Sequence, residues 1–241
     1  MLAYFQEAFK LYKNNFLRVL LIGITVLLPI QLIYTILINY VAMPFQYFNL
    51  PLWTSIFQSI FMLMSVFVMF IPLISMVAQD TRTSSVKTGK LYGDTIRYAF
   101  FAYLISIPVS ILITTGLLVL IVPGIILLVL LIGIPFVTVI EDERPKSVIK
   151  KSISFGKENF LSICGILLSF AAFDVVGTYL VTFAASVLNG QMAFANWLMI
   201  ILNIFVLPLF VFTIAKAYLN WNGETDTIQE KAYLRQLEQY N

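Results

Sequence analysis

Six long apolar stretches, with charged residues only in alternate connections, constrain this chain more than any other feature. The stretches cover roughly residues 17–40, 54–78, 98–119, 123–140, 160–188 and 196–219. A helix needs about 20 apolar residues to cross a hydrocarbon core about 30 Å thick. Five stretches reach that length, and the fourth is slightly short. The pattern predicts an all-α membrane protein with six transmembrane helices.

The composition excludes a soluble globular domain. Hydrophobic residues make up 60% of the chain and charged residues 11%, whereas about a quarter of the residues in a soluble domain are charged. A soluble domain of 241 residues has too little interior to hide that much apolar surface. The first partner we expect is therefore the lipid bilayer. Residues 1–16 lack the features of a cleaved signal peptide, so we expect the first span to be retained.

The positions of the basic residues predict the orientation. All 15 Lys and Arg flank the stretches on one side, and the connections 41–53, 120–124 and 189–195 carry no charge. Basic residues near the ends of spans stay on the cytoplasmic side. We therefore expect a multi-pass protein of the plasma (inner) membrane with both termini in the cytoplasm. Asp174 is the one charged residue that this arrangement cannot place at the cytoplasmic face.

Internal spacing predicts three tandem helical hairpins in the same orientation. Arginines precede prolines by eleven residues twice, and prolines precede charged residues by eight three times. These pairs are Arg18/Pro29, Arg97/Pro108, Pro72/Asp80, Pro135/Glu143 and Pro208/Lys216. The hairpins would cover about 1–79, 80–143 and 144–219 within a membrane domain of residues 1–219. Residues 220–241 form a cytoplasmic tail, in which Thr227-x-x-Glu230 has the spacing of a helix capping box.

Short cytoplasmic interfacial helices are predicted before the first and third hairpins. Apolar residues recur every three or four positions over 2–16, and the stretch from Pro145 repeats this pattern with lysines outward. The stretch 82–97 is a weaker candidate because Gly89 and Gly93 interrupt it. Five lysines on these helices are expected to contact anionic headgroups, each favourably by about 1 kcal/mol. They are Lys10, Lys13, Lys150, Lys151 and Lys157.

Asp174 is the strongest candidate for a functional residue. It lies fourteen residues past Phe160, and a carboxylate at that depth costs about 2.5–3.5 kcal/mol unless it faces protein or water. Other polar residues fall at nearly the same depth, namely Gln31, Ser65, Ser110 and Asn203. They are interpreted either as a polar layer that lines a cavity with Asp174 as a proton or cation site, or as a buried hydrogen-bond cluster that fixes helix packing.

The remaining candidates point to no specific chemistry. Residues 141–143 are Glu-Asp-Glu, which either gather a divalent cation or, more simply, precede the helix that opens at Pro145 and complement its dipole. Prolines inside the spans act as hinges or are tolerated there. The chain has no His and one Cys, so no disulfide, catalytic site, cofactor or metal site is predicted, and nothing favours nucleic-acid binding.

Residues 122–162 carry a resemblance to a known family. Pro123-Gly124 opens the fourth stretch, an acidic cluster follows it, and then come Pro145-x-x-Val148-x-x-x-Ser152 and Lys157-x-Asn159-Phe160. This pattern resembles the YciC-like bacterial inner-membrane proteins and is similar to the membrane domain of some glycerophosphodiester phosphodiesterases. Val148 stands where that pattern usually has Ala. The resemblance implies a multi-pass bacterial membrane protein, and it supplies no catalytic residues.

Two functions remain open at this point. The first is a non-catalytic membrane protein that acts with other membrane proteins, as a partner, a permease-like subunit or an envelope-homeostasis factor. The second is a small transporter or channel with a polar site around Asp174. An intramembrane lipid-processing enzyme is the least favoured, because it would need two converging reactive groups at one depth.

Overall fold

The computed structural model describes residues 2–142, 145–187 and 192–225, and every regular element within them is a helix. Six helices or helix pairs are long and apolar enough to cross a membrane, which confirms the predicted fold class. The elements in chain order are α1 (Leu2–Asn14), α2 (Phe16–Ile22), the π-helical turn η1 (Gly23–Leu27), α3 (Leu28–Tyr47), α4 (Pro51–Thr83), α5 (Thr88–Val119), α6 (Ile121–Leu131), α7 (Ile134–Glu141), α8 (Pro145–Glu158), α9 (Phe160–Val187) and α10 (Met192–Trp221).

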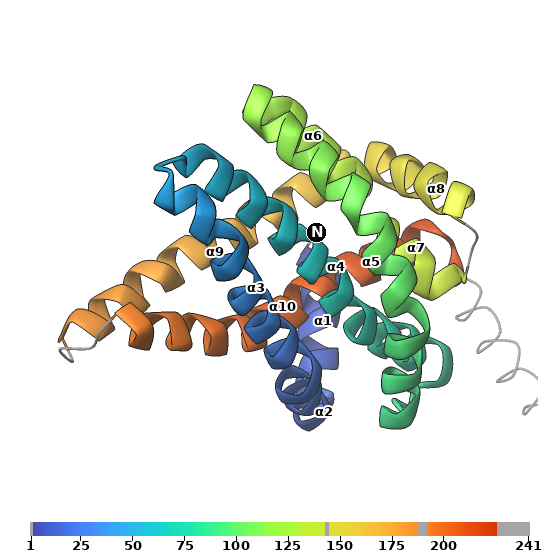
Figure 1. Cartoon of the computed structure of the whole chain (residues 1–241). Coiled ribbons are helices and arrows are strands. Elements are labelled where there is room, and N and C mark those ends of the chain that lie inside the picture. Colours follow the sequence, from blue (N-terminus) through green and yellow to red (C-terminus); the bar gives the residue numbers. More distant parts are fainter. Residues whose placement is uncertain (1, 143–144, 188–191, 226–241) are drawn as a thin grey trace, which may run out of the picture.

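The spans pair into three helical hairpins whose tips diverge. One hairpin joins α2, η1 and α3 to α4, the second joins α5 to α6 and α7, and the third joins α9 to α10. Figure 1 shows the three tips pointing in different directions, with the α5–α6 tip at the top and the α9–α10 tip at the far left. The other ends converge on α1, α7 and α8. We call this end the charged end, because it holds α1, α8 and the loop between α4 and α5.

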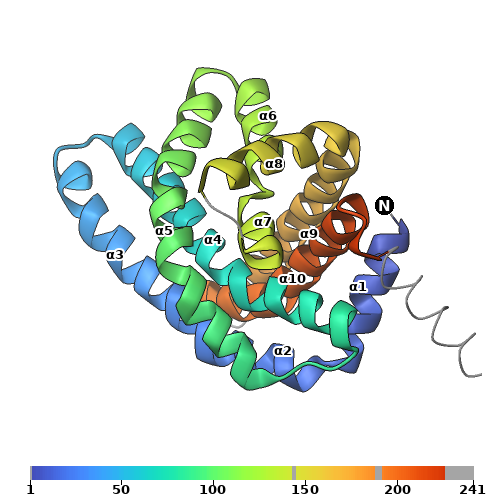
Figure 2. The ribbon, with the colours of Figure 1, turned by 90° about the vertical axis from the view of Figure 1, so that its right-hand side faces the viewer.

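Two of the expected interfacial helices are present, and the third is absorbed into a span. Helix α1 packs against α10, and α8 packs against α6 and α7, as Figure 2 shows. The stretch 82–97 forms no separate helix, because α4 continues to Thr83 and α5 begins at Thr88. The space around Gly89 and Gly93 is open, so neither glycine meets a neighbour that would bend the backbone there. Intrahelical hydrogen bonds then carry α5 straight into its apolar part.

Two prolines coincide with breaks in helix geometry. The turn η1 directly precedes Pro29, and the fourth span is interrupted between α6 and α7, just before Pro135. A proline cannot donate the helical hydrogen bond and its ring crowds the preceding turn, so the backbone rearranges there. Pro72, Pro108 and Pro208 instead lie within continuous helices.

The hydrophobic core lies toward the charged end. Residues 69–79 of α4 are buried on every side of the helix, together with Ile134–Ile140 of α7 and much of the last three turns of α10. A helix that is buried all round belongs to the centre of a bundle. By contrast, α9 buries only Ile163, Ile166, Gly177 and Ala185. The predicted capping box at 227–230 lies outside the described residues.

Candidate functional site

Three of the five predicted polar residues lie together inside the membrane domain. Gln31, Ser65 and Asn203 come from α3, α4 and α10 and line one cavity of about 230 Å³. The Ser65 hydroxyl donates to the carbonyl of Phe61 at 2.9 Å. The buried Oε1 of Gln31 accepts no hydrogen bond from any described residue. The cavity therefore has unused hydrogen-bonding capacity at membrane depth.

Ser110 and Asp174 do not line this cavity. Ser110 is fully buried in α5, where its hydroxyl donates to the carbonyl of Ile107 at 2.9 Å. Asp174 lies on an exposed part of α9. Only its backbone carbonyl is engaged, by the hydroxyl of Thr178 at 2.9 Å. Among the described residues, no hydrogen bond or ion pair reaches the Asp174 carboxylate.

The position of Asp174 on α9 explains its exposure. Phe170 and Gly177 lie four residues before it and three after it, so all three share one side of the helix. Gly177 is buried, and a Cβ there would lie 2.7 Å from Leu202 of α10. Asp174 therefore lies beside the α9–α10 contact, where the divergence of the hairpins leaves no neighbour to cover it.

A polar pocket at the charged end was not predicted. We call it the basic pocket; it has a volume of about 390 Å³ and lies between α4, α5 and α7. It is lined by Ser75, Ala78, Gln79, Arg82, Thr83, Ser85, Lys87, Lys90, Asp94, Arg97, Tyr98, Val139, Ile140 and Asp142. Four of these side chains are basic and two are acidic, so its lining has a positive balance.

The inner wall of the basic pocket is a chain of hydrogen bonds. The buried Ser75 hydroxyl donates to the carboxylate of Asp94, and the Gln79 amide donates to the Ser75 oxygen at 3.1 Å. The backbone N–H of Lys87 donates to Oε1 of Gln79 at 2.9 Å, which fixes the loop before α5 against α4. Arg97 pairs with Asp142, and the Tyr98 hydroxyl donates to the same carboxylate at 3.0 Å.

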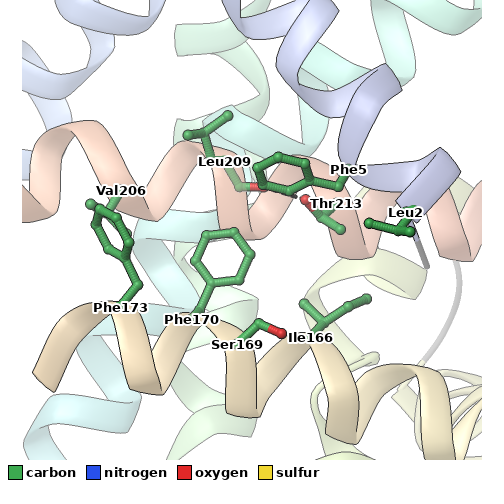
Figure 3. Close-up of a pocket in the computed structure, with 9 residues that line it drawn as sticks. All are labelled: Leu2, Phe5, Ile166, Ser169, Phe170, Phe173, Val206, Leu209 and Thr213. Atoms are coloured by element: carbon green, nitrogen blue, oxygen red, sulfur yellow. Dashed lines mark hydrogen bonds between the residues drawn. The ribbon is translucent and has the colours of Figure 1, made fainter. Parts of the chain in front are cut away.

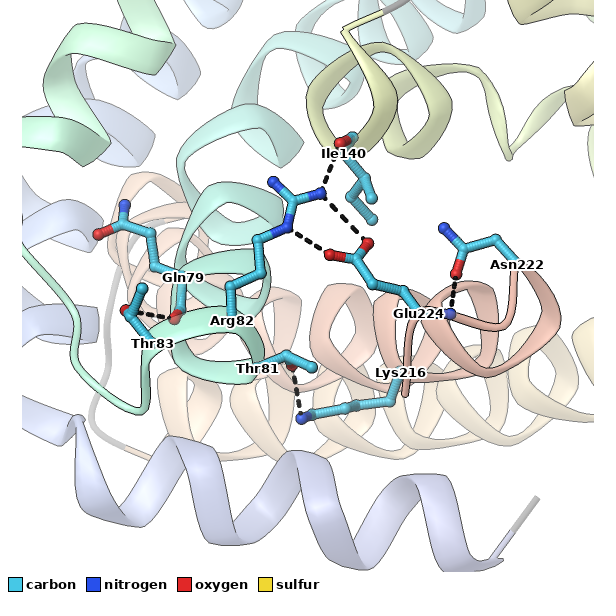
Figure 4. Close-up of polar contacts among 8 residues, drawn as sticks. All are labelled: Gln79, Thr81, Arg82, Thr83, Ile140, Lys216, Asn222 and Glu224. Carbon is cyan, nitrogen blue, oxygen red and sulfur yellow. Dashed lines mark hydrogen bonds and ion pairs between the residues drawn. The ribbon is translucent and has the colours of Figure 1, made fainter. Parts of the chain in front are cut away.

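Arg82 connects the basic pocket to the end of α10. Its guanidinium pairs with Glu224 and donates to the carbonyl of Ile140 at 2.7 Å, as Figure 4 shows. Beside it, the ammonium of Lys216 donates to the Thr81 hydroxyl at 3.1 Å. These bonds tie three hairpins together, because α4, α7 and α10 each come from a different one.

A second polar cluster surrounds Glu141. Its carboxylate accepts hydrogen bonds from Lys151 and from the buried hydroxyl of Tyr218. The Tyr218 ring packs edge-on against Phe155, with the ring centres 5.1 Å apart. Trp221 Nε1 donates to Glu158 at 2.7 Å. These contacts fasten α8 to the ends of α7 and α10, which is a structural role.

The other predicted positions have simple surroundings. Among the lysines expected at headgroups, Lys151 is half-buried at Glu141 and the rest are exposed, namely Lys10, Lys13, Lys150 and Lys157. Glu141 and Asp142 are held by Lys151 and Arg97, and residue 143 lies outside the described residues. No group of three metal-ligating side chains occurs within the described ranges.

An apolar groove of about 350 Å³ opens between α1, α9 and α10. Figure 3 shows its walls, with Leu2 and Phe5 on α1, Phe170 and Phe173 on α9, and Leu209 on α10. Such a groove suits lipid acyl chains, because they are as apolar as its lining.

Sequence reasoning missed the basic pocket, although one signal for it exists. Ser75 and Gln79 are four residues apart at the end of an apolar stretch, so they share a helix face. Their partners lie across a loop whose conformation the hydropathy pattern does not specify.

No family model, curated protein or solved structure matches this chain.

Proposed function

We propose that this multi-pass protein is a non-catalytic component of a bacterial plasma membrane that works by assembling with another integral membrane protein. It would serve as a partner or permease-like subunit, or as an envelope-homeostasis factor, in line with its resemblance to YciC-like proteins. The charged end would face the cytoplasm together with both termini, because basic residues gather there.

The observation that carries this proposal is the environment of Asp174. The residue lies near the middle of α9, a helix of 28 residues that is about 42 Å long. Its carboxylate is exposed and has no bonding partner among the described residues. A carboxylate left against lipid at that depth costs about 2.5–3.5 kcal/mol or more. A neighbouring transmembrane helix with a basic or hydrogen-bond-donating side chain would remove this cost.

The sparse burial of α9 supports the same conclusion. The most hydrophobic window of this span is only 17% buried, against 61% for α4. Large apolar side chains such as Val176, Tyr179 and Phe183 are exposed along it. In a bilayer, helices associate through packing and interhelical hydrogen bonds. The α9 surface offers both, with Asp174 as the polar contact.

The carboxylates at the charged end support the non-catalytic part of the proposal. Glu141 and Asp142 are occupied by basic and hydroxyl groups, and Asp94 accepts from Ser75. General acid–base catalysis needs a group free to exchange protons with a substrate. Asp174 is free, but no hydrogen bond or ion pair joins its carboxylate to a second reactive group among the described residues. The chain also lacks histidine. Turnover of a lipid by the purified protein would contradict this part.

Site-specific photo-cross-linking in native membranes tests the partner. A photo-reactive residue at Thr178, which lies on the Asp174 side of α9, is expected to capture a different membrane protein. The matched control is Leu168, which is 69% exposed on another side of the same helix. Asp174→Leu is expected to reduce the Thr178 adduct about tenfold or more, since a lost charged hydrogen bond is worth about 1.5–3 kcal/mol. Equal adducts from both positions, no adduct, or adducts only between two copies of this chain would contradict the proposal.

A second candidate function is a small transporter or channel, and the cavity at Gln31 favours it. The unbonded Gln31 Oε1 and the nearby Asn203 amide would contact water or a small polar solute. Under this alternative, Gln31→Leu should abolish flux in proteoliposomes while the protein still folds. Unchanged flux in Gln31→Leu would contradict transport through the cavity, and unchanged flux in Asp174→Asn would remove a transport role for Asp174.

A further inference from the structure

The basic pocket contains two lysines whose positive charges are not used within the described structure. Lys87 and Lys90 both line it, at the start of α5. Neither ammonium makes a hydrogen bond or ion pair with a described residue. Lys90 lies four residues before Asp94 and seven before Arg97, so all three lie on the same side of α5.

The remaining charges of the pocket are already committed. Arg97 is paired with Asp142 and Arg82 with Glu224, so these pairs are close to neutral. Asp94 accepts a hydrogen bond from Ser75, and its single carboxylate shares the pocket with the two ammonium groups of Lys87 and Lys90. The pocket therefore holds about one positive charge in excess. Such a site favours a ligand with one or two negative charges over a cation.

The position of the pocket narrows the ligand further. Ser75 and Gln79 are buried at the end of the α4 apolar stretch, and Val139 and Ile140 supply an apolar wall. The hydroxyls of Thr83 and Ser85 also line the pocket, and they donate to the Gln79 carbonyl and to the Thr83 oxygen. Lysines around a small anion are usual partners of phosphate oxygens. In the proposed orientation, the charged end places the pocket at the level of the lipid headgroups.

We propose that the basic pocket binds a phosphate ester, with Lys87 and Lys90 as its principal cationic contacts. The phosphate group enters between α4 and α5, and Arg82 and Arg97 form the sides of the site. Gln79 is a positioning residue, because its side-chain oxygen accepts a hydrogen bond from the backbone N–H of Lys87 and holds that residue in place. This site is independent of the assembly surface at Asp174, since no described residue of α9 lines the basic pocket.

Native mass spectrometry of the full chain in mild detergent tests the site. The probes are dioleoylphosphatidylglycerol, with dioleoylphosphatidylcholine as the zwitterionic comparison, and glycerol 3-phosphate as a soluble phosphate ester. The test variant is K87Q/K90Q. The matched control is K146Q/K150Q, which removes two exposed lysines from α8 at the same end of the molecule but outside the pocket.

The wild-type chain is expected to bind phosphatidylglycerol or glycerol 3-phosphate, and K87Q/K90Q to weaken that binding about tenfold or more. The control should change the binding of soluble glycerol 3-phosphate less than about twofold, and it should weaken phosphatidylglycerol binding less than K87Q/K90Q does, because Lys150 is expected to contact headgroups outside the pocket. Binding of the lipid that glycerol 3-phosphate cannot displace identifies a headgroup as the source, and displacement identifies a soluble ester. No binding of either probe, or equal weakening in both double variants, would overturn the proposal. Thermal unfolding of each variant verifies that the fold is retained.

Discussion

Replacing Gly156 by alanine is expected to loosen the contact of α8 with the fourth span. A Cβ on Gly156 would lie 2.6 Å from the Cα of Leu130 and 2.7 Å from the carbonyl oxygen of Val129. Both atoms belong to the backbone, so they cannot move aside by rotating a side chain. The Ser152 hydroxyl also donates to the Leu130 carbonyl at 2.8 Å, which holds the two helices at this separation.

The expected magnitude follows from two opposing effects. Overpacking of a close contact costs about 1–3 kcal/mol, and contact with backbone atoms of α6 favours the upper end. Alanine recovers about 1 kcal/mol of helix propensity relative to glycine. The net loss in the free energy of unfolding should therefore be about 2 kcal/mol. Gly93→Ala isolates the propensity effect, because nothing lies within 4 Å of its added Cβ; it should stabilise the protein by up to about 1 kcal/mol.

Reversible unfolding in mixed micelles, titrated with sodium dodecyl sulfate and followed by tryptophan fluorescence, measures both variants. The two glycines should give opposite signs. If Gly156→Ala is as stable as the wild type, or if it is stabilised as Gly93→Ala is, then the α8 contact with Leu130 does not have the close geometry described above.

Two further predictions concern the charged end. Tyr218→Phe removes the hydroxyl that donates to Glu141, whose side chain is only 16% exposed. The free energy of unfolding should fall by about 1.5–3 kcal/mol. As a control, Tyr179→Phe at an exposed position should change it by less than about 0.5 kcal/mol. Hydrogen bonds from Trp221 and then from Ser154 lower the pKa of Glu158, so its contribution is present above the ordinary glutamate pKa and is lost as the pH falls through the lowered value. In a variant with Trp221 as the only tryptophan, the fluorescence emission should stay constant from neutral pH down to the ordinary glutamate range and change below it. Adding Glu158→Gln should abolish this change. The same pH transition in the Glu158→Gln variant would refute the assignment to Glu158.

The number of spans and the interfacial helices α1 and α8 were predictable from the sequence. Hydropathy reports where lipid is the favoured solvent, and the periodicity over 2–16 reports which side of a helix lipid covers. The same signals say nothing about where a helix ends in water. The sequence therefore did not predict that α3 continues to Tyr47 and α4 to Thr83, beyond the ends of their apolar stretches.

Three-dimensional neighbours were the part that the sequence could not supply. Equal depth grouped five polar residues, but depth leaves the rotation of each helix undetermined. The packing turns Gln31, Ser65 and Asn203 toward one cavity, buries Ser110 within α5, and leaves Asp174 uncovered. The basic pocket depends on contacts between α4, α5 and α7, and no local pattern encodes them.

The central claim is a six-span chain with its charged end in the cytoplasm, and accessibility of single cysteines tests it most directly. In a Cys164→Ser background, Lys150→Cys lies at the charged end and Phe48→Cys lies at the tip of the first hairpin, and both positions are exposed. A membrane-impermeant maleimide added to intact cells should label Phe48→Cys, and it should label Lys150→Cys only after the membrane is permeabilised. Labelling of Lys150→Cys from outside intact cells would contradict the orientation, and recovery of the native chain from cytosol without detergent would contradict the membrane fold.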